Sequence, residues 1–427
     1  LWKSTDGGES WIQTLFRHPD QPGFNISLNR WTTGEWGWQT PPWSLVVDHN
    51  TPDIVTFTDF TMCGISHDGG KQWDIISSAP MCDGKSPAGG MQMFTGWNYY
   101  IDGNNHYGAT TDFTAWISSD AGKNWTFSPP VNTPWHNNIY AMAFLPDGQI
   151  FGAASLKHDL PYWHHMLSQG TQEHLWRGGV IISDDGGHTW THLDPISYDL
   201  PDLPATDILY DAGTNRLYIA YVGGGVYYSD DNGGSWIEVN SGLPCTNMNA
   251  LRLKMSPRGE LHLVVTAKWD RENESVVPGS VYKFDPERMQ WQPVETDPDI
   301  VFPVNLEFSA DGDAMYVSCF QLWREKRKTG GGAYSEPGAW QRSKVGAWRK
   351  IYSDYPVYSV NPVPDQKDCL LLGTIGQGAV MSSDGGSTWN RIKGLPPANI
   401  HSATFDPDNP GYVYLTTFGH GIWSGSL

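Results

Sequence analysis

Residues 226–236 read Val-Tyr-Tyr-Ser-Asp-Asp-Asn-Gly-Gly-Ser-Trp, an alternating apolar run that passes into a turn and then a tryptophan. The pattern Ser-x-Asp-x-Gly-x-x-Trp within it occurs six times in the 427-residue chain. Its aspartates are Asp6, Asp68, Asp120, Asp185, Asp231 and Asp384. An aspartate at this position accepts hydrogen bonds from its own turn, and the glycine supplies a positive φ. We therefore predict that these six carboxylates are structural and that each marks a hairpin turn.

The segments around each box repeat as well. Before the box of Asp231 lie two β-rich runs, 205–211 and 216–222, and a further strand follows the tryptophan. This order predicts a four-stranded antiparallel meander with the box between its third and fourth strands. Similar units cover 44–80, 91–130, 138–195, 205–241, 248–295, 303–353 and 357–395, with partial units at 1–17 and 398–427.

Repeated meanders of this length are typical of a β-propeller, in which ring closure removes exposed sheet edges. We therefore predict an all-β fold, a single β-propeller domain over residues 1–427 built from four-stranded antiparallel blades. The partial units 1–17 and 398–427 would close the ring together. Eight blades are favoured, and seven are the alternative.

Charge and composition narrow the class of partner. The chain has 27 Lys and Arg residues against 46 Asp and Glu residues, so its formal charge is 27 − 46 = −19. This charge disfavours nucleic acid and anionic membrane surfaces as partners. No run approaches 18 apolar residues, so no membrane span is predicted. Cys63 and Cys82 are close enough in sequence to form a disulfide or to remain thiols.

The six boxes resemble the Asp-box, or BNR, repeats of sialidases, two-domain xyloglucanases, sortilin-type receptors and a photosystem assembly factor. Their order is also similar to that in secreted bacterial Asp-box propellers described as sialidase-like or glycosyl hydrolase-like. The resemblance covers essentially the whole chain and implies a secreted or periplasmic propeller. It does not choose a function, because such boxes occur in hydrolases, receptors and assembly proteins alike.

Two departures from these families bear on activity. A sialidase carries an early Arg-Ile-Pro and three arginines that bind a carboxylate, whereas the nearest match here is Phe16-Arg17-His18-Pro19. No set of three arginines recurs at matching positions of the repeats. A two-domain xyloglucanase needs a second propeller, for which this chain is too short.

Three consecutive units carry an aspartate at the end of their second strand: Asp59, Asp112 and Asp159. In a propeller these strand ends lie on the face opposite the boxes, where loops from several blades converge. Paired carboxylates there can act as general acid and general base, so we expect Asp112 and Asp159 in these roles, with Asp59 as the alternate. The alternative is that each aspartate caps its own loop.

The loop 156–178 and the tryptophans supply further candidates. His158 and Tyr162 are catalytic or substrate-positioning candidates, and His106, His136 and Arg177 are candidate polar contacts to substrate. Trp36, Trp38 and Trp163 are expected to stack on sugar rings, unless they fill gaps between blades. The histidine spacing in this loop matches no strong metal motif, so no metal and no cofactor are predicted, although an ion in the channel is compatible with the sequence.

The sequence thus predicts a secreted glycoside hydrolase whose partner is a polysaccharide or oligosaccharide rather than nucleic acid. Two alternatives remain: a polysaccharide lyase using His158 and Tyr162 with Arg177, and a non-enzymatic propeller that binds glycan or protein. A hydrolase needs two carboxylates roughly 5–10 Å apart. A lyase needs the His–Tyr–Arg group to point inward together, and a binding protein needs neither.

Overall fold

The structure is a computed structural model of the chain. It describes residues 1–18, 20–27, 41–59, 63–76, 86–87, 94–112, 115–128, 133–135, 138–162, 166–168, 172–325, 332–344, 346–395 and 398–427. The chain divides into two compact units. The first contains Leu1–Met93, Asp102–His106 and Ser118–Thr126, and the second contains Phe94–Ile101, Tyr107–Ile117 and Phe127–Leu427.

The first unit is built on one four-stranded antiparallel sheet and one short hairpin. Its strands are β1 (Trp2–Lys3), β2 (Ile12–Gln13), β3 (Ser44–Val47), β4 (Val55–Thr58), β5 (Cys63–Ser66), β6 (Asp74–Ile75) and β7 (Ser86–Pro87). Strands β3 to β6 follow one another in the sheet, and β1 pairs with β2. Phe57 of β4 and Trp73 meet edge to face, with ring centroids 5.2 Å apart, and both are buried.

The second unit consists of successive antiparallel sheets. The first two comprise β8 (Gly96–Asp102), β9 (Asn105–Thr110), β10 (Ala115–Ser118) and β11 (Asn124–Ser128), then β12 (Asn138–Phe144), β13 (Ile150–Ser155), β14 (Gly178–Ser183) and β15 (Thr191–His192). The hairpin tips of the first of these sheets belong to the first unit, where β7 pairs with the start of β11. The next two comprise β16 (Ala205–Asp211), β17 (Arg216–Tyr221), β18 (Gly225–Ser229) and β19 (Ile237–Glu238), then β20 (Ala250–Met255), β21 (Leu261–Val265), β24 (Ser280–Asp285) and β25 (Gln290–Pro293).

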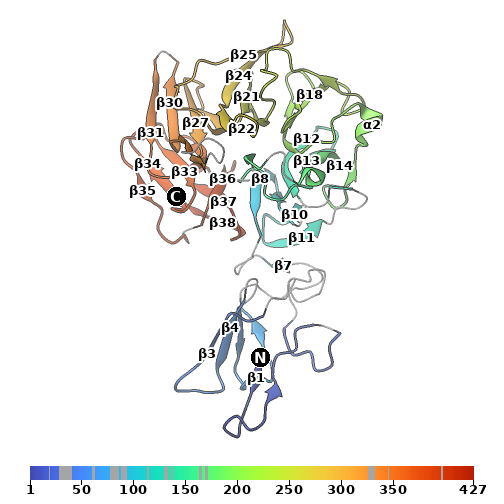
Figure 1. The fold of residues 1–427 in the computed structure, drawn as a ribbon, viewed down its shortest axis with the longest axis vertical. Coiled ribbons are helices and arrows are strands. Elements are labelled where there is room, and N and C mark those ends of the chain that lie inside the picture. The colour runs from blue at the N-terminus through green and yellow to red at the C-terminus, as the bar shows by residue number, and fades with distance from the viewer. Residues whose placement is uncertain are drawn as a thin grey trace. The chain divides into compact units, whose positions relative to one another are not determined.

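Three more sheets complete the unit. They comprise β26 (Pro303–Phe308), β27 (Ala314–Cys319), β30 (Gly338–Ser343) and β31 (Trp348–Tyr352), then β32 (Val357–Pro362), β33 (Leu370–Thr374), β34 (Ala379–Ser382) and β35 (Asn390–Arg391), and finally β36 (Ile400–Phe405), β37 (Tyr412–Thr417) and β38 (Ile422–Ser426). Figure 1 shows these sheets arranged around a common centre. The helical elements of the described residues are short: η1 (Glu173–Leu175) and α2 (Pro195–Tyr198).

The first strands of these sheets contact one another in sequence, from β12 through β16, β20, β26 and β32 to β36. The last sheet then meets the first: Thr404 Oγ1 donates to Tyr99 O at 2.9 Å, and Thr416 Oγ1 donates to Trp97 O at 3.3 Å. Asn98 Nδ2 in turn donates to Tyr140 O on β12 at 2.7 Å. These strands therefore form a closed ring within the second unit. The number of blades in the whole chain, and closure by residues 1–17 with 398–427, stay predictions.

A box glycine shows why the repeats stack so closely. Gly233 has φ +84°, and a Cβ at this position would lie 2.6 Å from Cε1 of Phe151 in the preceding sheet. The glycine therefore supplies both the turn and the space that the neighbouring sheet occupies. Among the described residues, no helix is long and apolar enough to cross a membrane.

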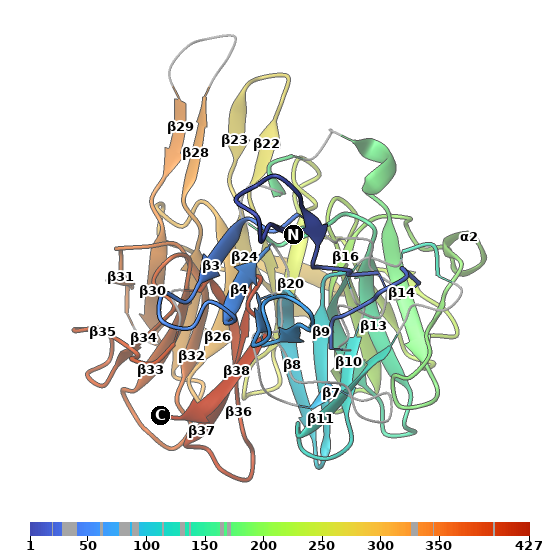
Figure 2. The same ribbon diagram turned by 90° about the horizontal axis from the view of Figure 1, so that it is seen from below.

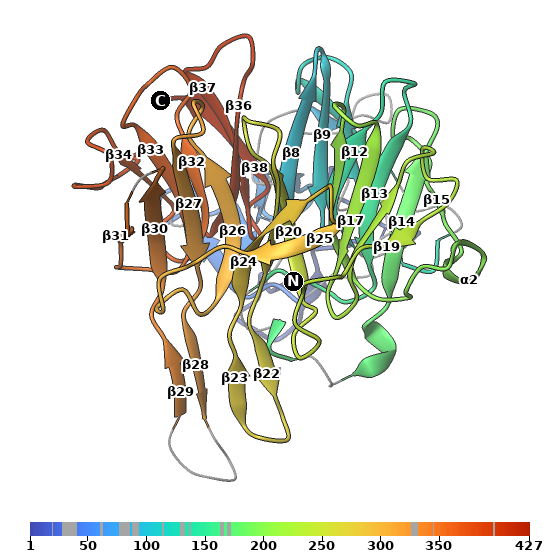
Figure 3. The ribbon, with the colours of Figure 1, turned by 90° about the horizontal axis from the view of Figure 1, so that it is seen from above.

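Two hairpins extend the loops between second and third strands. They are β22 (Lys268–Asp270) with β23 (Ser275–Val277), and β28 (Leu322–Glu325) with β29 (Gly332–Ser335). Figures 2 and 3 show both hairpins projecting side by side beyond the same end of the sheets. The long connection between β13 and β14 joins the corresponding strands of an earlier sheet. The elaborated loops are thus second-to-third-strand connections, the class that the sequence assigns to the face opposite the boxes.

Candidate active site

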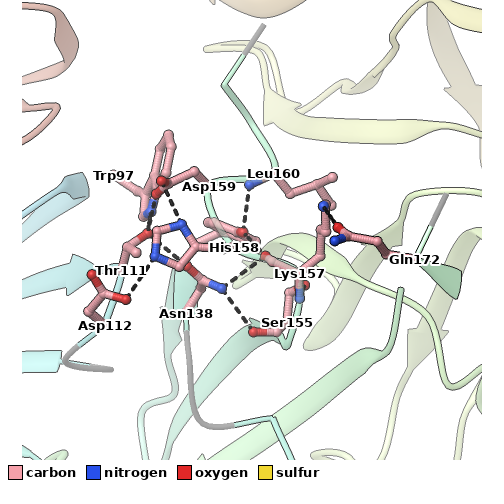
Figure 4. A network of polar contacts seen from close by, with 11 residues as sticks. Trp97, Thr111, Asp112, Asn138, Ser155, Lys157, His158, Asp159, Leu160 and Gln172 are labelled. Atoms are coloured by element: carbon pink, nitrogen blue, oxygen red, sulfur yellow. Dashed lines mark hydrogen bonds and ion pairs between the residues drawn. The ribbon is translucent and has the colours of Figure 1, made fainter. Parts of the chain in front are cut away.

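The candidate site forms where two neighbouring sheets end their second strands. Asp112 follows β9, and His158 and Asp159 follow β13. His158 Nε2 lies 2.8 Å from Asp112 Oδ1, and His158 Nδ1 lies 2.7 Å from Asp159 Oδ2 (Figure 4). One imidazole ring therefore bridges two carboxylates from different sheets, and we call these three side chains the bridge cluster.

The three groups of the bridge cluster differ in exposure. The side chain of Asp159 is 8% exposed, that of Asp112 is 33% exposed, and that of His158 is 46% exposed. Burial alone would lower the pKa of His158, but the hydrogen bonds and charges of Asp112 and Asp159 outweigh burial and raise this pKa from 6.5 to about 10. His158 is thus an imidazolium at neutral pH, with a proton on each ring nitrogen.

Both aspartates of the bridge cluster occupy the left-handed region of backbone space, with φ of 68° at Asp112 and 49° at Asp159. Non-glycine residues are uncommon there, and such conformations gather at functional sites because the surrounding structure must hold them. At Asp159 this hold is visible: Tyr140 Oη donates to Lys157 O at 2.7 Å and accepts from Leu160 N at 2.8 Å. The turn that carries His158 and Asp159 is therefore fixed from β12.

A buried polar layer lies behind Asp159. Thr111 Oγ1 is 2.9 Å from Asp159 Oδ1 and 2.7 Å from Asn138 Oδ1, and Trp97 Nε1 donates to Thr111 Oγ1 at 2.7 Å. Thr111 and Asn138 are each 1% exposed. The sequence analysis assigns no role to Thr111 or Asn138. The one signal in the sequence is that Thr111 precedes Asp112 at a strand end. Thr111 contacts Asn138 and Asp159 from a neighbouring sheet, and spacing along the chain does not predict such contacts.

An apolar cluster packs beside this layer. It contains residues from the first strands, from the long loop after β13 and from later parts of the ring. These are Trp97 and Tyr140, then Leu160, Met166 and Trp176, and finally Phe320 and Tyr358. Tyr162 packs against the same cluster and stacks on Phe418, with ring centroids 4.5 Å apart. Asn399 Nδ2 donates to its hydroxyl at 3.4 Å. The described contacts of Tyr162 thus hold it against the last sheet, whereas the sequence assigns it to catalysis.

Arg177 and His106 are two further residues that the sequence predicts as contacts to substrate. Arg177 Nε lies 2.7 Å from Asp202 Oδ2, so its guanidinium neutralises that carboxylate. His106 is the second residue of β9, and Asp112 follows the end of that strand. The described ion pair of Arg177 is therefore with Asp202 and not with the bridge cluster.

Asp59, the alternate acid, belongs to the first unit. It forms an ion pair with Arg17, and its side chain is fully buried. An aspartate in such a pair contributes to folding, because removal of either partner leaves a buried charge. Trp36, Trp38, Trp163 and His136 lie outside the described residues, as does Cys82, so their predicted roles and the Cys63–Cys82 pairing stay predictions.

The six box aspartates bind their own turns. At the fifth box, Asp231 Oδ1 accepts from Ser229 Oγ and from Ser235 N, both at 2.8 Å, and Asp231 Oδ2 accepts from Ser235 Oγ at 2.6 Å. The hydroxyl and N–H of Thr388, followed by the Ser382 hydroxyl, lower the pKa of Asp384 to about 2 in the same arrangement. The pKa values of Asp6, Asp68, Asp185 and Asp231 are lowered as well, so these carboxylates and Asp384 are ionised near neutral pH.

A cavity of about 490 Å³ lies along the first strands of the ring. Its lining includes Asp207, Arg252, Lys254 and Glu307 as well as Pro161, which follows the bridge cluster in sequence. Lys254 Nζ pairs with Glu307 Oε2 at 2.5 Å, and Asp207 Oδ2 accepts from Leu253 N at 2.8 Å. Among the described residues, no group of three or more His, Cys, Asp or Glu side chains is arranged to hold a metal ion.

No protein-family model matches the chain, and no curated protein matches it in sequence. Solved structures do match. YCF48 bound to a D1 peptide has a TM-score of 0.53 at 15% identity, over 82% of this chain and 98% of that one. The GH74 xyloglucanase from Xanthomonas campestris has a TM-score of 0.54 at 17% identity, over the whole of this chain and 55% of that one.

A third match is the extracellular domain of BT4673, a one-component system from B. thetaiotaomicron. Its TM-score is 0.52 at 13% identity, over 89% of this chain and 51% of that one. These neighbours are β-propeller proteins. At such identities the likeness shows the fold alone, and with the antiparallel sheets it confirms the predicted all-β propeller class.

Proposed function

We propose that this propeller is a glycoside hydrolase that cleaves a polysaccharide or oligosaccharide by general acid–base catalysis at the bridge cluster. The observation that carries the proposal is the single imidazole of His158 held between Asp112 and Asp159 at 2.8 and 2.7 Å. The imidazolium of His158 can donate a proton and the solvent-facing carboxylate of Asp112 can accept one, so the bridge cluster holds an acid and a base side by side. One residue of such a pair must hold a proton while the other accepts one.

The exposures assign the roles. Asp112 is the carboxylate that meets solvent, so it accepts a proton from the attacking water as the water oxygen bonds to the anomeric carbon. The glycosidic C–O bond breaks, and the leaving oxygen takes a proton from the half-exposed imidazolium of His158. Asp112 then returns its proton to His158 Nε2 across their hydrogen bond, which restores the starting state.

Asp159 has a supporting role in this scheme because it is buried. Its charge keeps His158 protonated, and its fixed position at Nδ1 orients the ring toward Asp112. It acts on substrate only through the ring. This differs from direct catalysis by Asp159, which the sequence favours.

The hydrolase is preferred over the lyase because the described contacts engage Tyr162 with Phe418 and Arg177 with Asp202, whereas the lyase needs both side chains for its chemistry. A xyloglucanase among the structural neighbours agrees with this choice but shares only the fold. A secreted or periplasmic location belongs to the proposal as well; one neighbour is an extracellular domain.

The test is a panel of polysaccharides read by reducing-sugar release and by the absorbance of unsaturated uronates. Wild type is compared with Asp112→Asn and with the box variant Asp231→Asn as a matched control. We expect reducing ends without unsaturated products, lost in Asp112→Asn and retained in Asp231→Asn. Unsaturated products would assign the site to a lyase, and silence across the panel would favour a binding propeller.

A further inference from the structure

The hydroxyl of Thr111 sits between two oxygen acceptors in a region closed to solvent. Its Oγ1 lies 2.7 Å from Asn138 Oδ1 and 2.9 Å from Asp159 Oδ1. Thr111 and Asn138 are 1% exposed and Asp159 is 5% exposed. Both contacts are short enough for a full hydrogen bond, yet a threonine hydroxyl has only one proton to donate.

The neighbours of this hydroxyl cannot supply the missing proton. Trp97 Nε1 already donates to Thr111 Oγ1 at 2.7 Å. Asn138 Nδ2 donates to Ser155 O at 3.1 Å and to Lys157 O at 2.9 Å, so the Asn138 amide cannot be turned round without two oxygen–oxygen contacts. Asn138 Oδ1 therefore faces Thr111 as an acceptor.

We propose that Thr111 is a positioning residue with two proton states, which lets Asp159 gain or lose a proton while its hydrogen bonds stay satisfied. When Asp159 is charged, the Thr111 hydroxyl donates to Asp159 Oδ1. When Asp159 is protonated on Oδ1, it donates to Thr111, whose own proton turns to Asn138. The second state has one hydrogen bond more, so Asn138 favours proton uptake by Asp159.

Other titratable groups also face Asp159. His158 lies on its own turn, and Asp112 follows β9; Tyr140 comes from β12, Tyr358 from β32 and His401 from β36. Burial raises the pKa of both tyrosines and lowers that of His401 to about 4, while His158 stays charged up to about pH 10.

This inference rests on the proposed function for its consequence. Protonation of Asp159 removes the charge that holds His158 in its cationic, oriented state. The hydroxyl of Thr111 and its acceptor Asn138 would therefore set the acid limb of the pH–rate profile. A threonine that only filled space would leave that limb unchanged.

The experiment is a double-mutant cycle read by carbon-13 NMR of aspartate-labelled full-length protein. The Asp159 carboxyl resonance is identified by its absence in Asp159→Asn. Asn138→Ala removes the alternative acceptor, so Asp159 should titrate at a pH lower by about half to one unit, as expected for loss of one hydrogen bond. In a Thr111→Val background, Asn138→Ala should cause no further shift, whereas a Thr111→Ser background should preserve it.

Equal shifts in the valine and threonine backgrounds, or no shift in either, would overturn the inference. Any structural cost of Asn138→Ala is common to both arms of the cycle and cancels. The NMR reading needs no substrate, so it separates the two proposals. A Thr111-dependent shift without glycan cleavage would support the two proton states of Thr111 and contradict the hydrolase. Glycan cleavage without a Thr111-dependent shift would support the hydrolase and contradict the two proton states.

Discussion

The box turn of Asp231 and the bridge cluster use the same carboxylate group in opposite ways. Asp231 binds Ser229 and Ser235, no more than four residues away, and its turn is complete without any other sheet. Asp112 binds His158, 46 residues away on a neighbouring sheet. The hydrogen bonds of Asp231 come from its own turn and keep that carboxylate ionised. Asp112 instead bonds to an imidazole from a neighbouring sheet, a partner with which it can exchange a proton.

The largest expected effect is on the rate of glycan cleavage, which should depend on Asp112 and not on Asp231. Asp112→Asn removes the proposed base and should lower kcat/KM on any substrate found in the panel by about 10²–10⁴-fold. Asp231→Asn should stay within about threefold of wild type. The measurement is initial-rate reducing-sugar release under matched conditions, and equal losses in both variants would remove the distinction between box and site.

Asp59 sharpens the comparison because it ends a second strand as Asp112 does but is buried against Arg17. Arg17→Met leaves the charge of Asp59 buried, so we expect a loss of about 3–5 kcal/mol in the stability of the unit that contains it. Urea unfolding followed by tryptophan fluorescence measures this loss. A variant as stable as wild type would show that Asp59 is not neutralised by Arg17.

His401 is a buried histidine held by long-range packing and by a backbone carbonyl. Burial lowers its pKa to about 4, although Nδ1 donates to Gly96 O at 2.7 Å; Trp97 stacks on its ring at 4.3 Å. In the unfolded chain His401 takes up a proton near pH 6.5, whereas in the folded chain it does so only near pH 4. The contribution of neutral His401 to the free energy of unfolding is therefore full above pH 6.5, and up to about 3 kcal/mol of it is lost as the pH falls to 4.

Comparison of wild type with His401→Phe in urea melts between pH 7 and 4 measures that loss. The phenylalanine variant should show a smaller decline over the same range, since its ring cannot take up a proton. Parallel declines in the two proteins would contradict a neutral, buried His401.

The smallest effect is expected at a single box. Asp231→Ala removes three hydrogen bonds within one exposed turn but leaves the strands on either side paired. We expect a decrease in Tm of less than about 5 °C, with activity retained. Differential scanning calorimetry checks the first point, and a collapse of the whole fold would show that a box does more than close its turn.

The same contrast explains what could be predicted from sequence. The boxes, the four-stranded units and the strand ends that carry Asp112 and Asp159 follow from local patterns, because turn chemistry and alternation act over a few residues. The position of His158 between both carboxylates, and the contacts of Tyr162 and Thr111, depend on how separate sheets pack. Spacing along the chain predicts no such contact, so the stacking of Tyr162 on Phe418 could not be read from the sequence.

The most direct test of the account is the protonation state of His158. Nitrogen-15 NMR of histidine-labelled protein, with His158→Gln to assign the signal, should show both ring nitrogens protonated at pH 7.5. Titration should occur near pH 10, and replacing Asp112 and Asp159 together by asparagine should lower the pKa of His158 to 6.5 or below, because burial then acts alone. A wild-type His158 that is neutral at pH 7.5 would contradict the bridge between the two carboxylates and the mechanism built on it.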